Sequence, residues 1–372
     1  MRLLIVTPGM HPPWVDGRIT SLKTFAETLA GQGVTVQVLT TANVEKTHFV
    51  EEKKVQYKLV PGGSSRNWFK LFQYYADYCA KDNVDIVIYR PFAGFNSVNV
   101  GSIILFRLVT LFFRKSFVLS LWSGPKQMVK IAWLFSGVFT THDIREKSGN
   151  VRVIPPIVDG SMDFKPVKDQ LFSKFGFEKG KKIGLFTYCG LVESEGLWNY
   201  TMEKRGLRTL IDAGSSLLEI PNFQIIVSIP FLSKDSARLK LQKILEERGL
   251  EKLFVLTSSV DDHLYELLSL SSVYIYPVNI EEISWAPISM IEAFACGTPV
   301  VTTKIPAITN FISDDDALLT SPGDSDSLAR SIKTIINDPM LAKKLCLKGK
   351  KKAQDFGPEA VGEQVQNILE QV

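Results

Sequence analysis

Short apolar runs alternate along this chain with segments in which apolar residues recur every three or four positions. The run from residue 3 to residue 7 predicts a first β-strand, and Ile19, Leu22 and Phe25 begin a helical pattern that ends near Gly31. Further strands are predicted at 34–40, 85–89, 117–121, 137–140 and 151–154. Strands that alternate with helices are typical of parallel sheets in α/β proteins.

The alternating pattern is interrupted once and then begins again. Pro155-Pro156, Asp159-Gly160 and Pro166 mark the interruption, which we interpret as a linker. Strands are then predicted at 183–188, 223–227, 253–256, 273–276 and 299–302. The sequence therefore predicts an α/β protein of two Rossmann-like, doubly wound domains that face each other across a cleft. We expect one domain at 1–160 and another at 161–354, with a C-terminal helix at 355–372 that packs back on the first.

Composition favours a globular protein in a reducing compartment. Hydrophobic residues make up 45% of the chain and charged residues 22%. The four cysteines are far apart and have no metal-binding spacing. The apolar run after Arg2 is too short for a signal peptide, and basic residues interrupt the longest apolar stretch, 100–122. We therefore expect a cytoplasmic protein.

Charge is distributed unevenly between the two halves. Residues 1–160 carry 19 lysines and arginines against 11 acidic residues, a formal charge of +8, whereas the remainder carries 24 against 28, or −4. No basic run has the form of a nucleic-acid-binding module, so nucleic acid is not an expected partner. The aromatic stretch 68–78 and the apolar stretch 103–113 lie beside basic residues. Each is interpreted either as a peripheral contact with an anionic membrane, at its inner face, or as an ordinary core helix.

The segment 292–301, with the sequence EAFACGTPVV, combines a carboxylate with a short apolar helix. Pro287 suits the beginning of that helix and Gly297 suits its end. Glu292 lies between apolar neighbours, where an unpaired carboxylate is costly. Its two oxygens match the paired donors of a ribose diol. The other interpretation is a solvated helix glutamate.

This segment resembles the C-terminal signature of the retaining GT-B glycosyltransferases of the group 1 family, glycosyltransferase family 4. The opening 3–17, the run 152–159 and the run 322–328 resemble further stretches of that family in the same order. The resemblance implies a GT-B fold, with an acceptor-binding N-terminal domain and a C-terminal domain that binds a nucleotide diphosphate sugar. It implies that Glu292 holds the donor ribose, and that Pro287 and Ile288 contribute to the donor site.

The chain departs from the family pattern at two places around the donor. Gly190 is followed by Leu191, where the family has arginine, whereas Arg205 occupies the family's lysine position with Lys204 beside it. A guanidinium can bind phosphate through two donors. The glutamate that contacts the donor sugar in the family is replaced at its usual spacing by Ser284. The sequence leaves open whether Glu281, Glu282 or Ser284 takes that role, or whether the two glutamates are solvated loop residues.

Three residues of the first half are further candidates. Asp16 and Gly17 lie in the loop after the first strand, where glycine permits a close approach to a diphosphate. Asp16 is interpreted as a contact to sugar hydroxyls or as a turn residue. His142, beside Asp143, is either half of an acid–base pair or a residue before a helix cap. The run Asp314-Asp315-Asp316 is predicted to form a turn, and no metal site is expected.

The sequence therefore predicts a metal-independent hexosyltransferase without a cofactor, which transfers a sugar to a glycan or lipid-linked acceptor. The alternative is a weakly active or inactive sugar-nucleotide-binding subunit. Nicotinamide-dependent oxidation is disfavoured, because the first loop lacks the G-x-G-x-x-G pattern.

Overall fold

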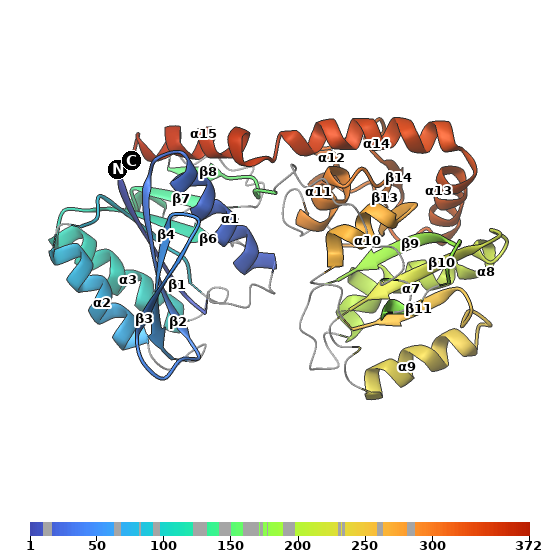
Figure 1. Cartoon of the computed structure of the whole chain (residues 1–372), viewed down its shortest axis with the longest axis horizontal. Helices are drawn as coiled ribbons and strands as arrows, with labels where there is room; N and C mark the ends of the chain where they lie inside the picture. The colour runs from blue at the N-terminus through green and yellow to red at the C-terminus, as the bar shows by residue number, and fades with distance from the viewer. Residues whose placement is uncertain are drawn as a thin grey trace. The chain divides into compact units, whose positions relative to one another are not determined.

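The computed structural model divides into two compact units (Figure 1). Unit 1 comprises Met1–Ile157 and Gly357–Val372, and unit 2 comprises Val158–Phe356. The structure describes residues 1–9, 17–62, 68–81, 83–91, 97–121, 132–140, 150–158, 171, 174–176, 178–188, 198–229, 232, 235–258, 263–280 and 287–372.

Unit 1 is built on a sheet of eight strands in the order β3-β4-β2-β1-β5-β6-β7-β8. All neighbours are parallel except β3 and β4. Residues 3–7 of β1 are buried without interruption, as expected of a central strand covered on both faces. The strands are β1 (Arg2–Pro8), β2 (Thr35–Ala42), β3 (His48–Glu52), β4 (Val55–Pro61), β5 (Ile86–Tyr89), β6 (Ser116–Leu121), β7 (Gly137–Thr140) and β8 (Val151–Val153).

Helices cover both faces of this sheet. α2 (Trp68–Ala80) and α3 (Ser97–Phe112) pack on one face, and α1 (Gly17–Gly31) and α15 (Pro358–Leu369) pack on the other. Gly362 permits the close approach of α15 to α1, because a Cβ at this position would overlap Thr28 and Gln32. The C-terminus is tied to β6 by a hydrogen bond of 2.9 Å that Ser116 donates to the carbonyl oxygen of Val372. A short 3₁₀ helix, η1 (Ala132–Leu134), precedes β7.

The hairpin of β3 and β4 was not predicted from the sequence. Its two-residue turn consists of Lys53 and Lys54, which adopt left-handed φ values of 44° and 66°. Asparagine and glycine usually occupy such turns, so two lysines give no turn signal. Lys53 Nζ lies 3.3 Å from Glu27, which also pairs with Lys23 at 2.9 Å. The ion pair between Lys53 and Glu27 links the hairpin to α1.

Unit 2 contains a sheet of six parallel strands in the order β11-β10-β9-β12-β13-β14. The strands are β9 (Lys182–Thr187), β10 (Phe223–Ser228), β11 (Phe254–Thr257), β12 (Val273–Tyr276), β13 (Val300–Thr303) and β14 (Leu318–Thr320). The α/β fold with two doubly wound parallel sheets, expected from the alternating pattern, is confirmed.

The helices of unit 2 also form two layers. One layer contains α7 (Leu207–Asp212), α8 (Gly214–Leu217), α9 (Asp235–Glu246) and α13 (Ser325–Asn337). The opposite layer contains α10 (Leu264–Leu270), α11 (Ile288–Ala295) and α12 (Pro306–Thr309). α14 (Pro339–Gln354) is capped at its N-terminus by Asp338, whose carboxylate accepts a hydrogen bond of 2.9 Å from the backbone N–H of Leu341. A π-helical turn, η2 (Tyr200–Lys204), precedes α7.

Each sheet has a point at which the winding of the chain reverses. In unit 1 this point lies between β1 and β5, and in unit 2 it lies between β9 and β12. Ligands of doubly wound proteins bind beyond the carboxyl ends of the strands at such points. The topology therefore defines two places where functional side chains are expected.

Candidate active site

Helix α11 carries Glu292 into the interior of unit 2. The helix follows Pro287, which has a φ of −57° and a ψ of 125°, and it ends before Gly297, which has a φ of 72°. The predicted short helix between these two residues is confirmed. Apolar side chains surround the carboxylate, because four neighbours along α11 are buried: Met290, Ile291, Ala293 and Phe294.

A tyrosine of the neighbouring helix holds the Glu292 carboxyl group. The hydroxyl of Tyr265, on α10, donates a hydrogen bond of 2.9 Å to Glu292 Oε1. Burial raises the pKa of Glu292 to about 7, and the hydrogen bond from Tyr265 moderates that rise. Only 9% of Glu292 is exposed. A ligand that donates hydrogen bonds to this group would therefore favour its ionised form.

Arg205, at the end of η2, lies among three tyrosines. Its guanidinium carbon is 4.8 Å from the centre of the Tyr188 ring and 5.3 Å from that of the Tyr200 ring. Arg205 Nη1 donates a hydrogen bond of 3.1 Å to the hydroxyl of Tyr276. We call Tyr188, Tyr200 and Tyr276 the tyrosine cage. Tyr188 directly follows β9 and Tyr276 ends β12, so the cage lies at the reversal point of this sheet.

The charge of Arg205 has no carboxylate partner among the described residues, and its buried Nε has no hydrogen-bond partner there either. Burial by itself lowers the pKa of this guanidinium, but the three tyrosine oxygens outweigh it and raise the pKa above its usual value. Aromatic rings stabilise a cation without neutralising it. The cage therefore presents a fixed positive charge that suits an anionic ligand.

The junction between η2 and α7 is held by the turn that follows β12. Gly206 has a φ of 78°, and a Cβ at this position would overlap the carbonyl oxygen of Pro277. Asn279 donates its backbone N–H to the carbonyl oxygen of Lys204 at 2.9 Å and its side-chain amide to the Thr209 hydroxyl at 2.9 Å. These contacts fix the backbone that carries Arg205.

The structure describes only some of the remaining candidate residues. Lys204 is exposed, Pro287 is buried and Ile288 is half-buried. Gly17 is the first residue of α1, and it follows the loop that was predicted after the first strand. Six candidates lie outside the described residues: Asp16, His142, Gly190, Glu281, Glu282 and Ser284.

The predicted turn at Asp314–Asp316 is confirmed. Asp316 accepts the backbone N–H of Ser313 at 2.9 Å, and Asp315 lies 3.3 Å from Lys344 Nζ. No group of three histidines, cysteines, aspartates or glutamates that could hold a metal ion occurs in the described part of the chain.

Comparisons with known proteins agree with this geometry. Residues 202–354 match the model of the family described as glycosyl transferases group 1. Over 195 residues the chain is 26% identical to the 2-deoxystreptamine glucosyltransferase of Streptomyces kanamyceticus, a match that covers 51% of this chain and 46% of that relative.

Solved structures resemble the whole chain. A glycosyltransferase from Rickettsia africae ESF-5 superposes with a TM-score of 0.75 at 15% identity and covers 100% of this chain and 98% of its own. HepE from Anabaena, in complex with UDP-glucose, gives a TM-score of 0.71 at 14% identity, with both chains covered to 100%. The two doubly wound sheets have the fold of the GT-B glycosyltransferases. Residues 202–354 of this chain are thus similar to the glycosyl transferases group 1 family, and the fold of the whole chain is that of glycosyltransferases.

Proposed function

We propose that this protein is a retaining, metal-independent hexosyltransferase that uses a nucleotide diphosphate sugar and delivers the sugar to a glycan or lipid-linked acceptor. The observation that carries the proposal is Arg205, a half-buried cation in the tyrosine cage at the reversal point of the sheet in unit 2. The relatives add support, since one is a glucosyltransferase and another binds UDP-glucose.

The diphosphate of the donor is the group that we assign to Arg205. As the sugar leaves, negative charge develops on the β-phosphate oxygen, and a guanidinium already in place stabilises that charge without reorganisation. Among the described residues, the Nε of Arg205 has no hydrogen-bond partner and its guanidinium has no carboxylate partner. The guanidinium therefore has N–H groups that can donate to phosphate oxygens. Lys204, exposed beside Arg205, would add a second positive charge.

The ribose of the donor is the group that we assign to Glu292. Its carboxylate would accept hydrogen bonds from the two adjacent ribose hydroxyls, while Tyr265 continues to hold Oε1. Such donors compensate the burial of the charge, which otherwise favours the neutral acid. Pro287 and Ile288 would border the same ligand, because they begin the helix that carries Glu292.

In the proposed reaction the acceptor hydroxyl oxygen bonds to the anomeric carbon as the bond from that carbon to the β-phosphate oxygen breaks. The hydroxyl proton passes to the departing phosphate on the same face of the sugar, so the anomeric configuration is retained. Positioning and stabilisation of the leaving group supply most of the rate in this scheme. Asp16, Glu281, Glu282, Ser284 and His142 remain the candidates for contacts to the sugar and acceptor.

The decisive experiment measures turnover and binding of UDP-, GDP- and ADP-glucose by the full chain. We expect one of them to raise the melting temperature and to be hydrolysed or transferred, with the product anomer read by NMR. Arg205→Gln should lower turnover at least about 100-fold. The matched control is Arg208→Gln, because Arg208 lies on the adjacent helix and pairs with Glu203 at 2.7 Å on the surface. The proposal is wrong if none of the three sugars binds or reacts.

The same experiment separates the alternative function. A sugar-nucleotide-binding subunit would show stabilisation by one of the three sugars and no turnover in the presence of any acceptor. In that case the roles of Arg205 and Glu292 in binding would stand, and the catalytic part of the proposal would be rejected.

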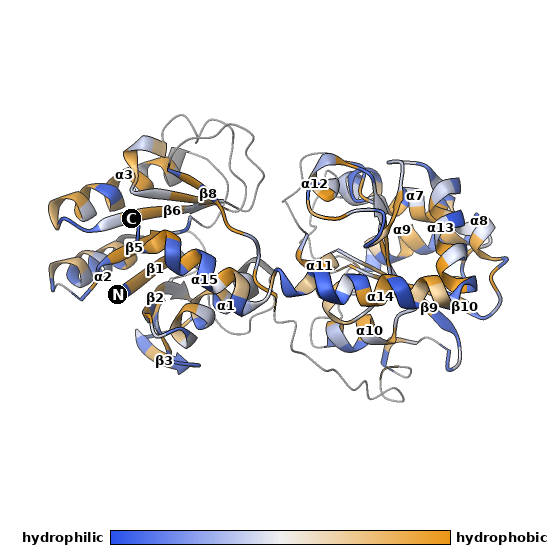
Figure 2. Ribbon diagram, turned by 90° about the horizontal axis from the view of Figure 1, so that it is seen from above, coloured by the Kyte–Doolittle hydropathy of each residue, from blue (hydrophilic) through white to orange (hydrophobic). Residues whose placement is uncertain are grey.

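Contact with an anionic membrane is proposed for one surface of unit 1. α3 is largely hydrophobic (Figure 2), and its described residues expose one apolar row. Arg107 Nε donates a hydrogen bond of 2.9 Å to the carbonyl oxygen of Leu134, which joins η1 to α3. We call the exposed apolar residues of these two helices the α3–η1 surface: Ile104, Leu108, Leu111, Phe112, Trp133 and Leu134.

The positive charges around the α3–η1 surface support an anionic membrane as its partner. Arg107, Arg114 and Lys115 border it, in the half of the chain that carries a formal charge of +8. Apolar residues with a tryptophan and a basic border suit the interface of an anionic bilayer. Among the described residues, no helix has the length and apolar character needed to cross a membrane. The other predicted stretch, α2, is a core helix, because Leu71, Tyr75 and Cys79 are buried against the sheet.

A further inference from the structure

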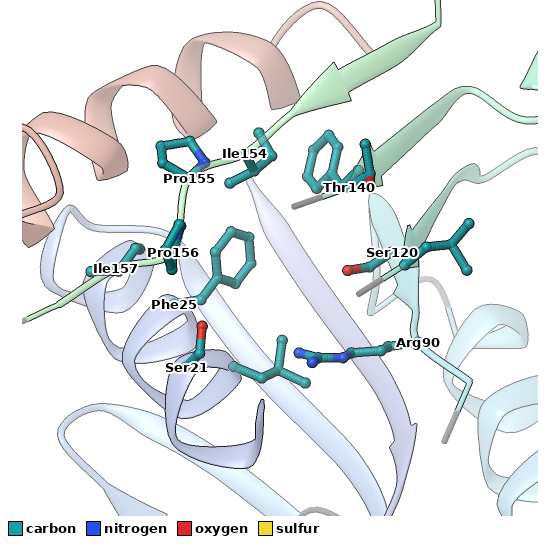
Figure 3. A pocket seen from close by; sticks show the side chains of 12 residues that line it. Ser21, Phe25, Arg90, Ser120, Thr140, Ile154, Pro155, Pro156 and Ile157 are labelled. Atoms are coloured by element: carbon teal, nitrogen blue, oxygen red, sulfur yellow. The ribbon is translucent and has the colours of Figure 1, made fainter. Parts of the chain in front are cut away.

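A cavity lies at the carboxyl edge of the sheet in unit 1 (Figure 3). The empty space within it, including the part that is open to solvent, is about 460 Å³. It is bordered by residues at the ends of β6 and β7, by Arg90 directly after β5, and by the beginning of α1. Since β5 adjoins β1 at the reversal point of this sheet, the cavity lies where a doubly wound domain binds its ligand.

Arg90 is the charged residue of this cavity. Its backbone N–H donates a hydrogen bond of 2.9 Å to the carbonyl oxygen of Val6, which fixes the residue beside the end of β1. Its side chain is directed into the cavity (Figure 3), and only 7% of the residue is exposed. A buried guanidinium always carries its charge and presents donors in one plane, a geometry that matches an oxyanion.

The walls of the cavity divide into hydroxyl groups and apolar surfaces. Ser21, Ser120 and Thr140 place hydroxyl-bearing side chains on it, and the Ser120 hydroxyl faces the interior in Figure 3. Phe25 and the pair Pro155-Pro156 provide apolar surface. No aspartate or glutamate is among the described residues of the lining. The described lining therefore suits a ligand that has an anionic group and hydroxyls on a ring with an apolar face.

We propose that this cavity binds an oxyanion carried by the acceptor, a phosphate or a carboxylate on a sugar, and that Arg90 is its recognition residue. The inference rests on the proposed function in one respect, because it takes the ligand of unit 1 to be the acceptor of the transferred sugar. Arg90 and Ser120 hold the oxyanion, and the proline and phenylalanine surfaces contact the sugar ring. The class of acceptor is therefore an anionic sugar, either a sugar phosphate or a uronic acid.

The test measures the affinity of the full chain for glucose 6-phosphate, glucose 1-phosphate, glucuronate and glucose by calorimetry, without any nucleotide. We expect at least one anionic sugar to bind at least about tenfold more tightly than glucose. Arg90→Gln should weaken the binding of that anionic sugar at least about tenfold. Lys81→Gln, which removes one exposed positive charge from the same unit, should leave the affinity unchanged. A preference for glucuronate identifies a carboxylate, and a preference for a sugar phosphate identifies a phosphate.

Two further variants keep the test decisive. Ser120→Ala leaves the charge in place and should weaken binding about threefold, so the proposal can be judged even if Arg90→Gln does not fold. Arg205→Gln should retain the affinity, because Arg205 is assigned to the diphosphate of the donor and does not line this cavity. If Arg205→Gln abolishes binding of the anionic sugar while Arg90→Gln and Ser120→Ala retain it, the ligand occupies the donor site and the inference is overturned. Equal affinities for glucose and all three anionic sugars also overturn it. Neither result bears on nucleotide-sugar turnover, which tests the proposed function separately.

Discussion

Arg205 donates a hydrogen bond of 3.1 Å to the hydroxyl of Tyr276, the last residue of the strand beside the reversal point in unit 2. The two residues belong to segments that are far apart in the sequence. Their contact aims the guanidinium from the end of η2 toward the place where the topology puts a ligand. Tyr276 thereby positions the cation instead of neutralising it.

The first prediction concerns this hydrogen bond. Tyr276→Phe keeps the aromatic ring but removes the hydroxyl that orients Nη1 of Arg205. We expect UDP-glucose, or the sugar nucleotide identified in the screen, to bind about threefold to tenfold more weakly, with little change in melting temperature. Calorimetry measures the affinity, and Tyr78→Phe in unit 1 serves as the control. Unaltered affinity would show that the ring alone positions the arginine.

The second prediction is a pH dependence of donor binding. Because the pKa of Glu292 is raised to about 7, this group is mostly neutral at pH 6 and mostly ionised at pH 8. If the ionised form accepts the ribose hydroxyls, affinity for UDP-glucose should rise about tenfold from pH 6 to pH 8. UDP-glucose suits the measurement because its diphosphate does not titrate in this range. Glu292→Gln should flatten the profile, and a wild-type profile that is already flat would contradict the assignment.

A third prediction follows for the stability of the ligand-free protein. The folded protein binds more protons at Glu292 than the unfolded chain does between pH 4.5 and 7, so the contribution of this group to stability falls as pH rises through that window. Above pH 7, Glu292 is mostly ionised in the folded protein, so the full free-energy cost of burying its charge reduces the stability. Glu292→Gln should therefore stabilise the ligand-free protein at pH 8 by on the order of 1–3 kcal/mol. Urea denaturation at pH 5 and pH 8 measures this, and a gain that is equal at both pH values would argue against a titrating carboxyl.

The fourth prediction compares two glycines that both have left-handed backbone conformations. Gly206→Ala should destabilise the protein by about 3 kcal/mol or more, because the new methyl group overlaps the Pro277 carbonyl oxygen. Gly180→Ala has a similar φ, 88°, but open space around it, and should cost only about 1 kcal/mol. Thermal and urea unfolding measure both variants. Similar losses in the two would mean that the turn after β12 adjusts to the methyl group.

The fifth prediction tests the α3–η1 surface. The double variant Leu108→Ser and Phe112→Ser should reduce binding to phosphatidylglycerol vesicles at least about tenfold, because it removes two exposed apolar side chains. Leu239→Ser, at an equally exposed leucine of α9, is the control. Sedimentation with vesicles gives the bound fraction, and neutral phosphatidylcholine vesicles should bind less of the wild type. Equal binding of the double variant and the wild type would contradict the proposal.

Local signals in the sequence predicted a large part of this fold. Alternating apolar runs located six of the eight described strands of unit 1 and five of the six described strands of unit 2 within a few residues, because a parallel strand that is covered on both faces must be apolar throughout. Pro287 and Gly297 likewise defined α11, since proline and glycine act on the backbone where they stand. The β3–β4 hairpin was missed for the corresponding reason, because Lys53 and Lys54 adopt turn conformations that their residue type does not indicate.

The sequence by itself identified Glu292 and Arg205 as candidates, because both lie in short motifs whose residues are neighbours along the chain. Only the tertiary structure assigned Tyr265 to Glu292 and the tyrosine cage to Arg205, and only it directed Arg90 into a cavity. These partners come from strands and helices that meet because the sheets are wound in a particular order. Burial, hydrogen-bond partners and shifted pKa values depend on these tertiary contacts, so they cannot be predicted from the order of residue types along the chain.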